Sequence, residues 1–246
     1  MPGIIEHGPA IDLDEPTLVE GFPGIGLVGK IATDHLIEEL EMTYHASVNC
    51  AGLPLIGTYQ SGDRMVRPPV RLYVSESANL YALQSDTPVA ADAARTVAQC
   101  VTGWLDERDV TPIYLSGLPA EREDEPAIFG VATGDAGSSL DDIDVAEPNQ
   151  SGAVSGPTGA LLNCAAARGR SAIGLIVESS PQFPDPEAAR VLLEDAIAPI
   201  TDVDVDVSEL LDRAEEIKAQ REELAKRMQE ATSEESSQAR PMQMYQ

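Results

Sequence analysis

Short apolar segments alternate with longer amphipathic segments along this chain, and that alternation limits the fold more than any other sequence feature. The apolar segments have the length and residue types of strands and lie at residues 17–22, 44–53, 70–74, 79–84, 111–118, 127–133 and 171–178. Helical spacing predicts helices over 27–40, 86–108, 155–168 and 184–197. This order predicts an α/β fold with a largely parallel or mixed sheet flanked by helices.

Local signals sharpen three of these boundaries. Asp86 stands just ahead of Pro88, and Asp185 just ahead of Pro186, so each is expected to cap a helix that begins there. Gly169 is expected to stop the helix that opens near residue 155. Segments 70–74 and 79–84 alternate well enough to form the two strands of a hairpin.

A glycine-rich turn separates the first strand from the first helix. Gly24, Gly26 and Gly29 match the dinucleotide fingerprint, and with Lys30 they make most of a P-loop. Both matches are incomplete, because Ile31 stands where a P-loop needs a hydroxyl, and no acidic residue falls where ribose recognition requires one. The alternative is that these glycines let a helix start hard against the sheet, with Lys30 on a solvated face.

The charge balance excludes whole classes of partner. There are 42 acidic and 16 basic residues, a formal net charge of -26, and such a surface repels nucleic acid and anionic lipid. It suits a cytosol of molar salt, where screening is strong, so we interpret the source as halophilic. The densest basic cluster, Arg64, Arg67 and Arg71, could grip an anion or an acidic neighbouring subunit, but pairing with local carboxylates is the commoner arrangement.

Few residues suggest catalysis or metal binding. The histidines are His7, His35 and His45, no nucleophile motif accompanies them, and His35 is expected to be a surface or packing residue. The acidic loop carrying Asp135, Asp141, Asp142 and Asp144 lacks EF-hand spacing. We therefore expect no metal, no cofactor and no enzyme activity.

The cysteines and the apolar runs indicate a cytoplasmic protein. Cys50, Cys100 and Cys164 are an odd number, lie far apart in apolar segments, and are expected to be buried hydrophobic residues, not a disulfide framework or a metal site. We find no signal peptide and no apolar run long enough to span a bilayer.

The C-terminal part has a different pattern. Apolar residues at four-three spacing predict an amphipathic helix over 206–231, which could pack on its own domain or on a neighbouring subunit. The polar residues that follow predict disorder. We expect an α/β domain at 1–205, this helix, and a flexible tail at 232–246 that acts as a tether.

The tail ends in Met244, Tyr245 and Gln246. A hydrophobic residue, a tyrosine and a last residue with a carboxylate resemble the HbYX tail, by which proteasome activators and assembly factors dock between core α-subunits. Such a tail can insert two apolar side chains into a pocket while a lysine or backbone N–H groups capture its carboxylate.

Three longer segments resemble the archaeal proteasome assembly chaperone family. They are residues 20–29, residues 155–162, and residues 177–180 followed by 184–189, which occur in the expected order. The resemblance implies an α/β fold like that of the nucleoside phosphorylases without their catalytic residues, and symmetric homo-oligomers. It also implies, as in some archaeal members, an HbYX-type tail that binds the proteasome core particle or its α-subunits.

Two functions from different classes remain. The first is an ATP-independent proteasome assembly chaperone or regulator that forms homo-oligomers and docks on the 20S core α-subunits through Met244, Tyr245 and Gln246. The second is a nucleotide- or phosphate-binding enzyme that uses Gly24 to Lys30.

Overall fold

An eight-stranded mixed sheet forms the centre of the protein, in the order β1-β3-β4-β5-β2-β6-β8-β7. The computed structural model describes residues 3–59, 62–121, 124–141, 143, 145–182 and 184–212. The strands are β1 (Gly3–Glu6), β2 (Thr17–Gly21), β3 (Thr43–Asn49), β4 (Val70–Ser75), β5 (Leu80–Ser85), β6 (Thr111–Pro119), β7 (Ile128–Thr133) and β8 (Ala172–Ser179).

The middle of the sheet is parallel and its two sides are antiparallel. β2 runs parallel to β5 and β6, and β6 runs parallel to β8. β4 and β5 form the predicted hairpin, with β3 and β1 beyond it, and β7 lies antiparallel to β8 at the other side. The predicted α/β class with a mixed sheet is confirmed, while the finer likeness to nucleoside phosphorylases stays a prediction.

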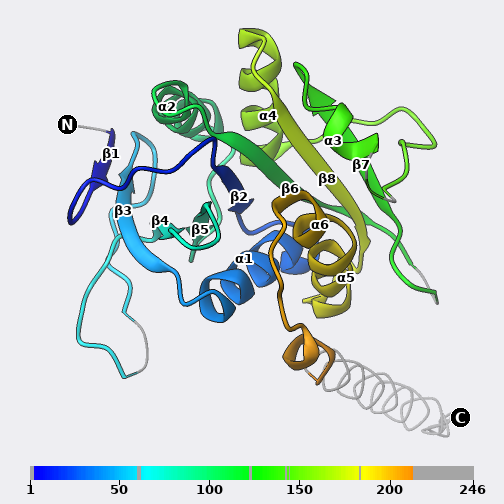
Figure 1. Ribbon diagram of the computed structural model, residues 1–246, viewed down its shortest axis with the longest axis horizontal. Helices are drawn as coiled ribbons and strands as arrows, with labels where there is room; N and C mark the ends of the chain where they lie inside the picture. The colour runs from blue at the N-terminus through cyan, green and yellow to red at the C-terminus, as the bar shows by residue number, and fades with distance from the viewer. Residues whose placement is uncertain are drawn as a thin grey trace, which may run out of the picture.

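Helices cover both faces of this sheet (Figure 1). One face carries α2 and α4, which contact each other, and the opposite face carries α1 and α5. The helical elements are η1 (Ile25–Leu27, a 3₁₀ turn), α1 (Val28–Glu39), α2 (Ala94–Asp106), α3 (Ser138–Asp141), α4 (Gly156–Arg168), α5 (Pro186–Leu192), η2 (Leu193–Ile197, a π-helical turn) and α6 (Ala198–Thr201).

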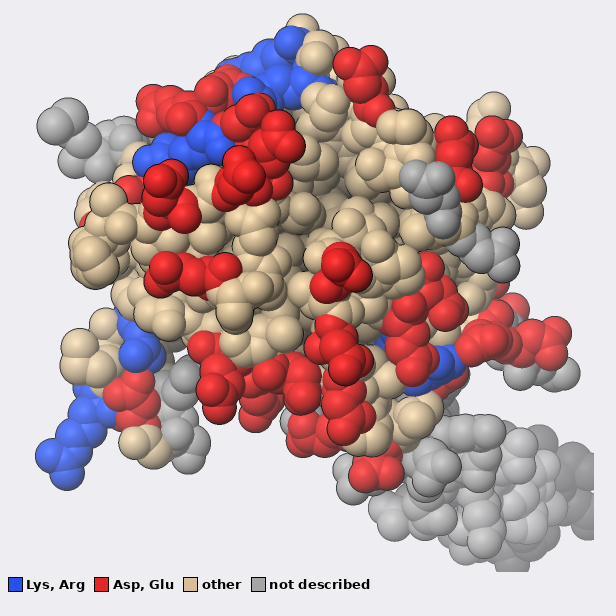
Figure 2. Space-filling view, viewed as in Figure 1, with Lys and Arg blue, Asp and Glu red and all other residues tan. Residues whose placement is uncertain are grey.

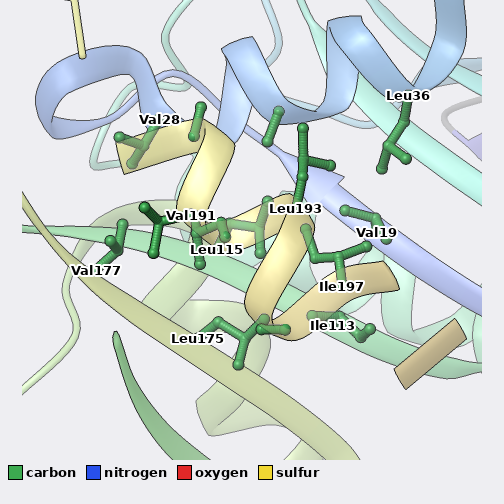
Figure 3. Close-up of a cluster of buried hydrophobic side chains, with 14 of the residues drawn as sticks. Val19, Val28, Leu36, Ile113, Leu115, Leu175, Val177, Val191, Leu193 and Ile197 are labelled. Carbon is green, nitrogen blue, oxygen red and sulfur yellow. The ribbon is translucent and has the colours of Figure 1, made fainter. Parts of the chain in front are cut away.

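The apolar core beneath α1 and α5 is built from alternate residues of the parallel strands. Val19, Ile113 and Leu175 point from β2, β6 and β8 toward helix residues such as Leu36 and Leu193 (Figure 3). All five side chains are fully buried. Burying each one stabilises the fold by about 2 kcal/mol relative to exposure, which fixes the position of α1 on the sheet.

Two of the three helix-boundary predictions are confirmed and one is wrong. The Asp185 side chain accepts a hydrogen bond from the backbone N–H of Ala188 and caps α5, and Gly169 ends α4 in the left-handed conformation. Asp86 does not cap α2, which begins only at Ala94. Its carboxylate is instead held by the Arg71 guanidinium at 2.8 Å, a stronger partner than a backbone N–H.

The prediction that the cysteines form no disulfide is wrong. Cys50 and Cys100 form a disulfide, while Cys164 is free and half-buried. The two bonded residues are 50 positions apart in the chain. They come together because Cys50 follows β3 and Cys100 lies on α2, which packs on the same face of the sheet. The sequence alone could not predict this pairing, because only the tertiary fold brings the two residues together.

The predicted C-terminal helix and tail lie largely outside the described residues, which end at 212. Residues 208–212 are helical, and Leu210 is fully buried against the core beneath α1. In the described part of the chain, no helix combines the length and apolar character that crossing a membrane requires.

Candidate functional site

The glycine-rich turn lies at the carboxyl edge of the parallel strands. It leaves the end of β2, between β5 and β6, and leads into α1. Ligands of open α/β sheets bind beyond this edge, so the geometry of the turn can separate the two interpretations of its glycines.

Neighbouring backbone atoms fill the space beside several glycines. A Cβ on Gly21 would lie 2.5 Å from the carbonyl oxygen of Gly29. A Cβ on Gly117 of β6 would lie 2.5 Å from the carbonyl oxygen of Ile25. These distances are well below van der Waals contact, so glycine is needed for α1 and its turn to approach the sheet. This arrangement supports a packing role.

The start of α5 occupies the inner side of the turn. The backbone N–H of Asp185 donates to the carbonyl oxygen of Gly26 at 2.8 Å. Gly26 has φ +60°, and a Cβ there would lie only 1.9 Å from Ser179 Oγ. The Asp185 carboxylate in turn accepts from Ser179 Oγ at 3.2 Å and from the N–H of Ser180 at 2.9 Å. An acidic side chain of the protein therefore packs directly against the turn at Gly26.

Lys30 is engaged by carboxylates. Its Nζ lies 2.7 Å from an Asp34 oxygen, one helical turn along α1, and 3.8 Å from an Asp86 oxygen. A P-loop lysine reaches toward phosphate oxygens, and Ile31 supplies no hydroxyl for a metal ion. The residues Gly24, Gly26, Gly29 and Lys30 are thus brought together, but in a turn packed by its own chain.

Glu20 is a fully buried acid beneath the turn. Burial raises the pKa of Glu20 to about 8, although hydrogen bonds from the Phe22 N–H and from Thr158 Oγ1 favour its ionised form. Near neutral pH its carboxyl group mostly retains its proton. Thr158 lies in the first turn of α4, so Glu20 links the end of β2 to the helix on the opposite face from α1.

The histidines do not supply a base to this site. His35 is buried in α1 and its Nε2 contacts the carbonyl oxygen of Asp206 at 2.7 Å, as expected for a packing residue. His7 pairs with Ser47, and His45 lies 3.8 Å from a Glu6 oxygen in the β1 and β3 region. The edge therefore holds buried carboxyl and hydroxyl groups that are hydrogen-bonded to each other.

The three segments that carry the family resemblance meet at this edge. Glu20 from the first contacts Thr158 from the second, and Gly26 from the first contacts Asp185 from the third. The sequence did not predict these contacts, which join residues 138 and more positions apart. The available signal was that each segment carries hydroxyl or acidic residues, the residue types that satisfy buried polar groups.

No metal centre is evident among the described residues, where no group of three or more potential metal ligands occurs. Asp135 and Asp141 line a shallow hollow of about 450 Å³ beside β7. Asp142 and Asp144, from the same predicted acidic loop, lie outside the described residues.

A second surface, which contains Arg64 and Arg67 of the arginine cluster, extends from the sheet between β3 and β4. The sequence pointed to these arginines but not to the apolar residues beside them. We name residues 53–59 and 62–67 the arm; its two sides pair antiparallel at Thr58 and Arg67 (Figure 1). It carries most of the large apolar side chains that are exposed in the described structure: Leu55, Ile56, Tyr59, Met65 and Val66. The arm is therefore a candidate contact surface.

The arginine cluster lies along the arm and at its base. Arg67 pairs with Asp63 at 2.7 Å, and buried Arg71 pairs with Asp86 at 2.8 Å, which confirms pairing with local carboxylates. Burial alone would raise the pKa of Asp86, but the hydrogen bond from Arg71 holds it below its usual value. Arg64 is exposed. The proposed docking residues Met244, Tyr245 and Gln246 lie outside the described residues.

Comparisons with known proteins agree on one family. The model of the PAC2 family matches residues 18–225. Pyrococcus furiosus PbaA, described as an archaeal homolog of proteasome-assembly chaperone, is similar with a TM-score of 0.79 and 25% identity over 96% of this chain and 97% of its own. P. furiosus PbaB, described as an archaeal proteasome activator, is similar with a TM-score of 0.77 and 25% identity over 92% and 100%. An uncharacterised Methanocaldococcus jannaschii protein is 28% identical over 87% of each chain.

Proposed function

The chain belongs to the PAC2 family, and we propose that it is an ATP-independent proteasome assembly chaperone or regulator that docks on the α-subunits of the core particle. The observation that carries this proposal is the end-to-end similarity to PbaA and PbaB, which are described respectively as a homolog of proteasome-assembly chaperone and as a proteasome activator.

The docking element in this proposal is the C-terminal sequence Met244-Tyr245-Gln246. Its two apolar side chains and the carboxylate can be bound together in a pocket between subunits. Several tails on one homo-oligomer would engage several pockets of the α-ring, so weak single contacts would sum to strong binding. The strongly acidic surface argues for assays in molar salt, consistent with a halophilic, cytoplasmic protein.

The packing of the glycine-rich turn supports a binding protein over a phosphate-dependent enzyme. Gly26 is covered by Ser179 and Asp185, and Lys30 is paired with Asp34. Such a turn offers phosphate no space at Gly26 and no uncommitted cation at Lys30. This arrangement supports the ATP independence that the proposal includes.

The test is retention of the protein on immobilised core particle in molar salt, with and without ATP. We expect full-length protein to be retained equally in both conditions and Tyr245→Ala to be lost. Met242→Ala is the matched control, because it changes an apolar residue of the same tail outside the last three positions. Equal retention of the Tyr245→Ala variant would reject tail docking, and retention only with ATP would reject ATP independence.

A further inference from the structure

We propose that the arm is the surface by which one copy of this chain binds the acidic face of a second copy. The inference rests on the homo-oligomer within the proposed function and assigns it a contact. The arm extends away from the sheet beside β3 (Figure 1). Its composition and its anchoring both distinguish it from the rest of the surface.

Five of the exposed side chains of the arm are large and apolar. Leu55 is fully exposed, Tyr59 exposes 78% of its surface and Val66 exposes 66%. Ile56 and Met65 lie between them in the chain and are also exposed. Exposed apolar residues gathered on one segment indicate a contact with another protein, because solvent exposure of so much apolar area is unfavourable.

The base of the arm is held firmly. Arg71, only 2% exposed, donates to Thr58 Oγ1 at 2.8 Å, to the carbonyl oxygen of Pro68 at 3.0 Å, and to Gln84 Oε1 at 2.8 Å. The guanidinium of Arg67 lies 5.5 Å from the centre of the Tyr44 ring. The exposed residues are therefore presented on an anchored support, which lowers the entropy cost of binding.

Charge identifies the partner. The arm contains one acidic residue, Asp63, and two basic residues, Arg64 and Arg67, so its net charge is +1, and the remainder of the chain carries -27 to give the total of -26. Most contacts between two copies would bring acidic surfaces together. If the arm of one copy contacts an acidic face of another, opposite charges meet and apolar side chains are buried. If two arms contact each other, their arginines repel.

The acidic face lies at the end of α1. Glu38, Glu39 and Glu41 are exposed there, and the hydrogen bond of His35 to Asp206 brings the exposed residues Asp202 and Asp204 to the same side. In Figure 2 acidic side chains gather along the lower edge of the molecule, over α1 and the segment that follows α6, while basic side chains project from the arm at lower left. The two surfaces are distinct, so each copy can donate one and accept with the other.

This contact is heterologous, since the surface donated by one copy differs from the surface it meets on the next. Heterologous contacts close into rings when the rotation between copies allows it. A ring would present several copies of the tail on one assembly, as binding to several pockets of a proteasome ring requires.

The test is the molar mass of the protein in molar salt, measured by light scattering. We expect full-length protein at a multiple of 26.1 kDa and the triple variant Leu55→Ser, Tyr59→Ser and Val66→Ser at 26.1 kDa. Ile5→Ser, which changes an exposed apolar residue on β1, is the control and is expected to stay assembled. The three arm side chains are exposed, so an unchanged unfolding midpoint verifies the fold.

A charge exchange provides a second measurement. Arg64→Glu is expected to weaken association by about tenfold at reduced salt, and Glu39→Lys with Glu41→Lys in the same chain is expected to restore part of it. The inference would be overturned if the triple variant still assembled, or if the two lysine substitutions did not restore association of the Arg64→Glu variant. Either result would still be compatible with a homo-oligomer formed through another surface. Monomeric wild-type protein would reject self-association itself, whatever the tail binds. If the wild-type protein is monomeric and the triple variant no longer binds the core particle, the arm contacts the core particle and not a second copy of the chain. That result would also overturn the inference.

Discussion

The glycine-rich turn lies beneath neighbouring atoms of its own chain, whereas the arm leaves its largest side chains in solvent. At the turn, Gly26 is covered by Ser179, and the N–H of Asp185 bonds to its carbonyl oxygen. On the arm, Leu55 and the aromatic ring of Tyr59 are exposed, although burial of such apolar groups is favourable. The glycine-rich turn, whose motif resembles a ligand site, thus serves to pack α1 on the sheet. The arm, which matches no motif, has the properties of a contact surface. The predictions below test that contrast.

The disulfide at the root of the arm should give the largest effect. Reducing Cys50–Cys100 is expected to lower the free energy of unfolding by about 4 kcal/mol, because the bond closes a long loop, its partners being 50 residues apart. Chemical denaturation with and without reductant measures this. Cys164→Ala is the control and should leave the dependence on reductant unchanged. Identical midpoints in both conditions would show that the disulfide does not stabilise the root of the arm.

Buried Glu20 should make stability depend on pH. Its pKa is raised from 4.5 to about 8 in the folded protein, so folding retains a proton that the unfolded chain loses. Stability is therefore expected to fall as pH rises from about 5 to 8, by on the order of 3 kcal/mol. Glu20→Gln should flatten that slope, whereas exposed Glu39→Gln should not. A slope unaffected by Glu20→Gln would mean that Glu20 ionises normally beneath the turn.

Gly21, the last residue of β2, and Gly24, in the turn that follows it, should respond differently to alanine. Gly21→Ala places a Cβ 2.5 Å from the Gly29 carbonyl oxygen and is expected to cost roughly 2 kcal/mol of unfolding free energy. Gly24→Ala meets nothing closer than 4.0 Å and should change stability by less than about 0.5 kcal/mol. Thermal denaturation compares them. Equal costs would remove the packing explanation of the turn.

The smallest effect is expected at Lys30. Its ion pair with Asp34 is partly exposed, so Lys30→Ala should change stability by no more than about 0.5 kcal/mol. Added ATP or inorganic phosphate should raise the melting temperature of neither protein. Stabilisation of the wild type alone by either ligand would favour the phosphate-binding enzyme.

The sequence was informative wherever local chemistry decides the structure. Seven of the eight described strands, all but β1, and the α4 and α5 helices follow from apolar spacing, and Asp185 caps its helix as the Asp-Pro signal predicts. The similar signal at Asp86 predicted a helix cap that does not form, because Arg71, which is 15 positions away, binds its carboxylate instead. The Cys50–Cys100 disulfide and the Glu20–Thr158 contact were likewise not foreseen, since each joins segments that only the tertiary fold brings together.

The central claim is that the arm and the C-terminal residues 244–246, not the glycine-rich turn, carry the function. The most direct test is a titration of purified core particle in molar salt with four proteins: wild type, Tyr245→Ala, the triple arm variant and Lys30→Ala. We expect Tyr245→Ala to lose binding, the arm variant to bind at least about tenfold more weakly because it presents single tails, and Lys30→Ala to match the wild type. Loss of binding by Lys30→Ala together with full binding by Tyr245→Ala would contradict the account.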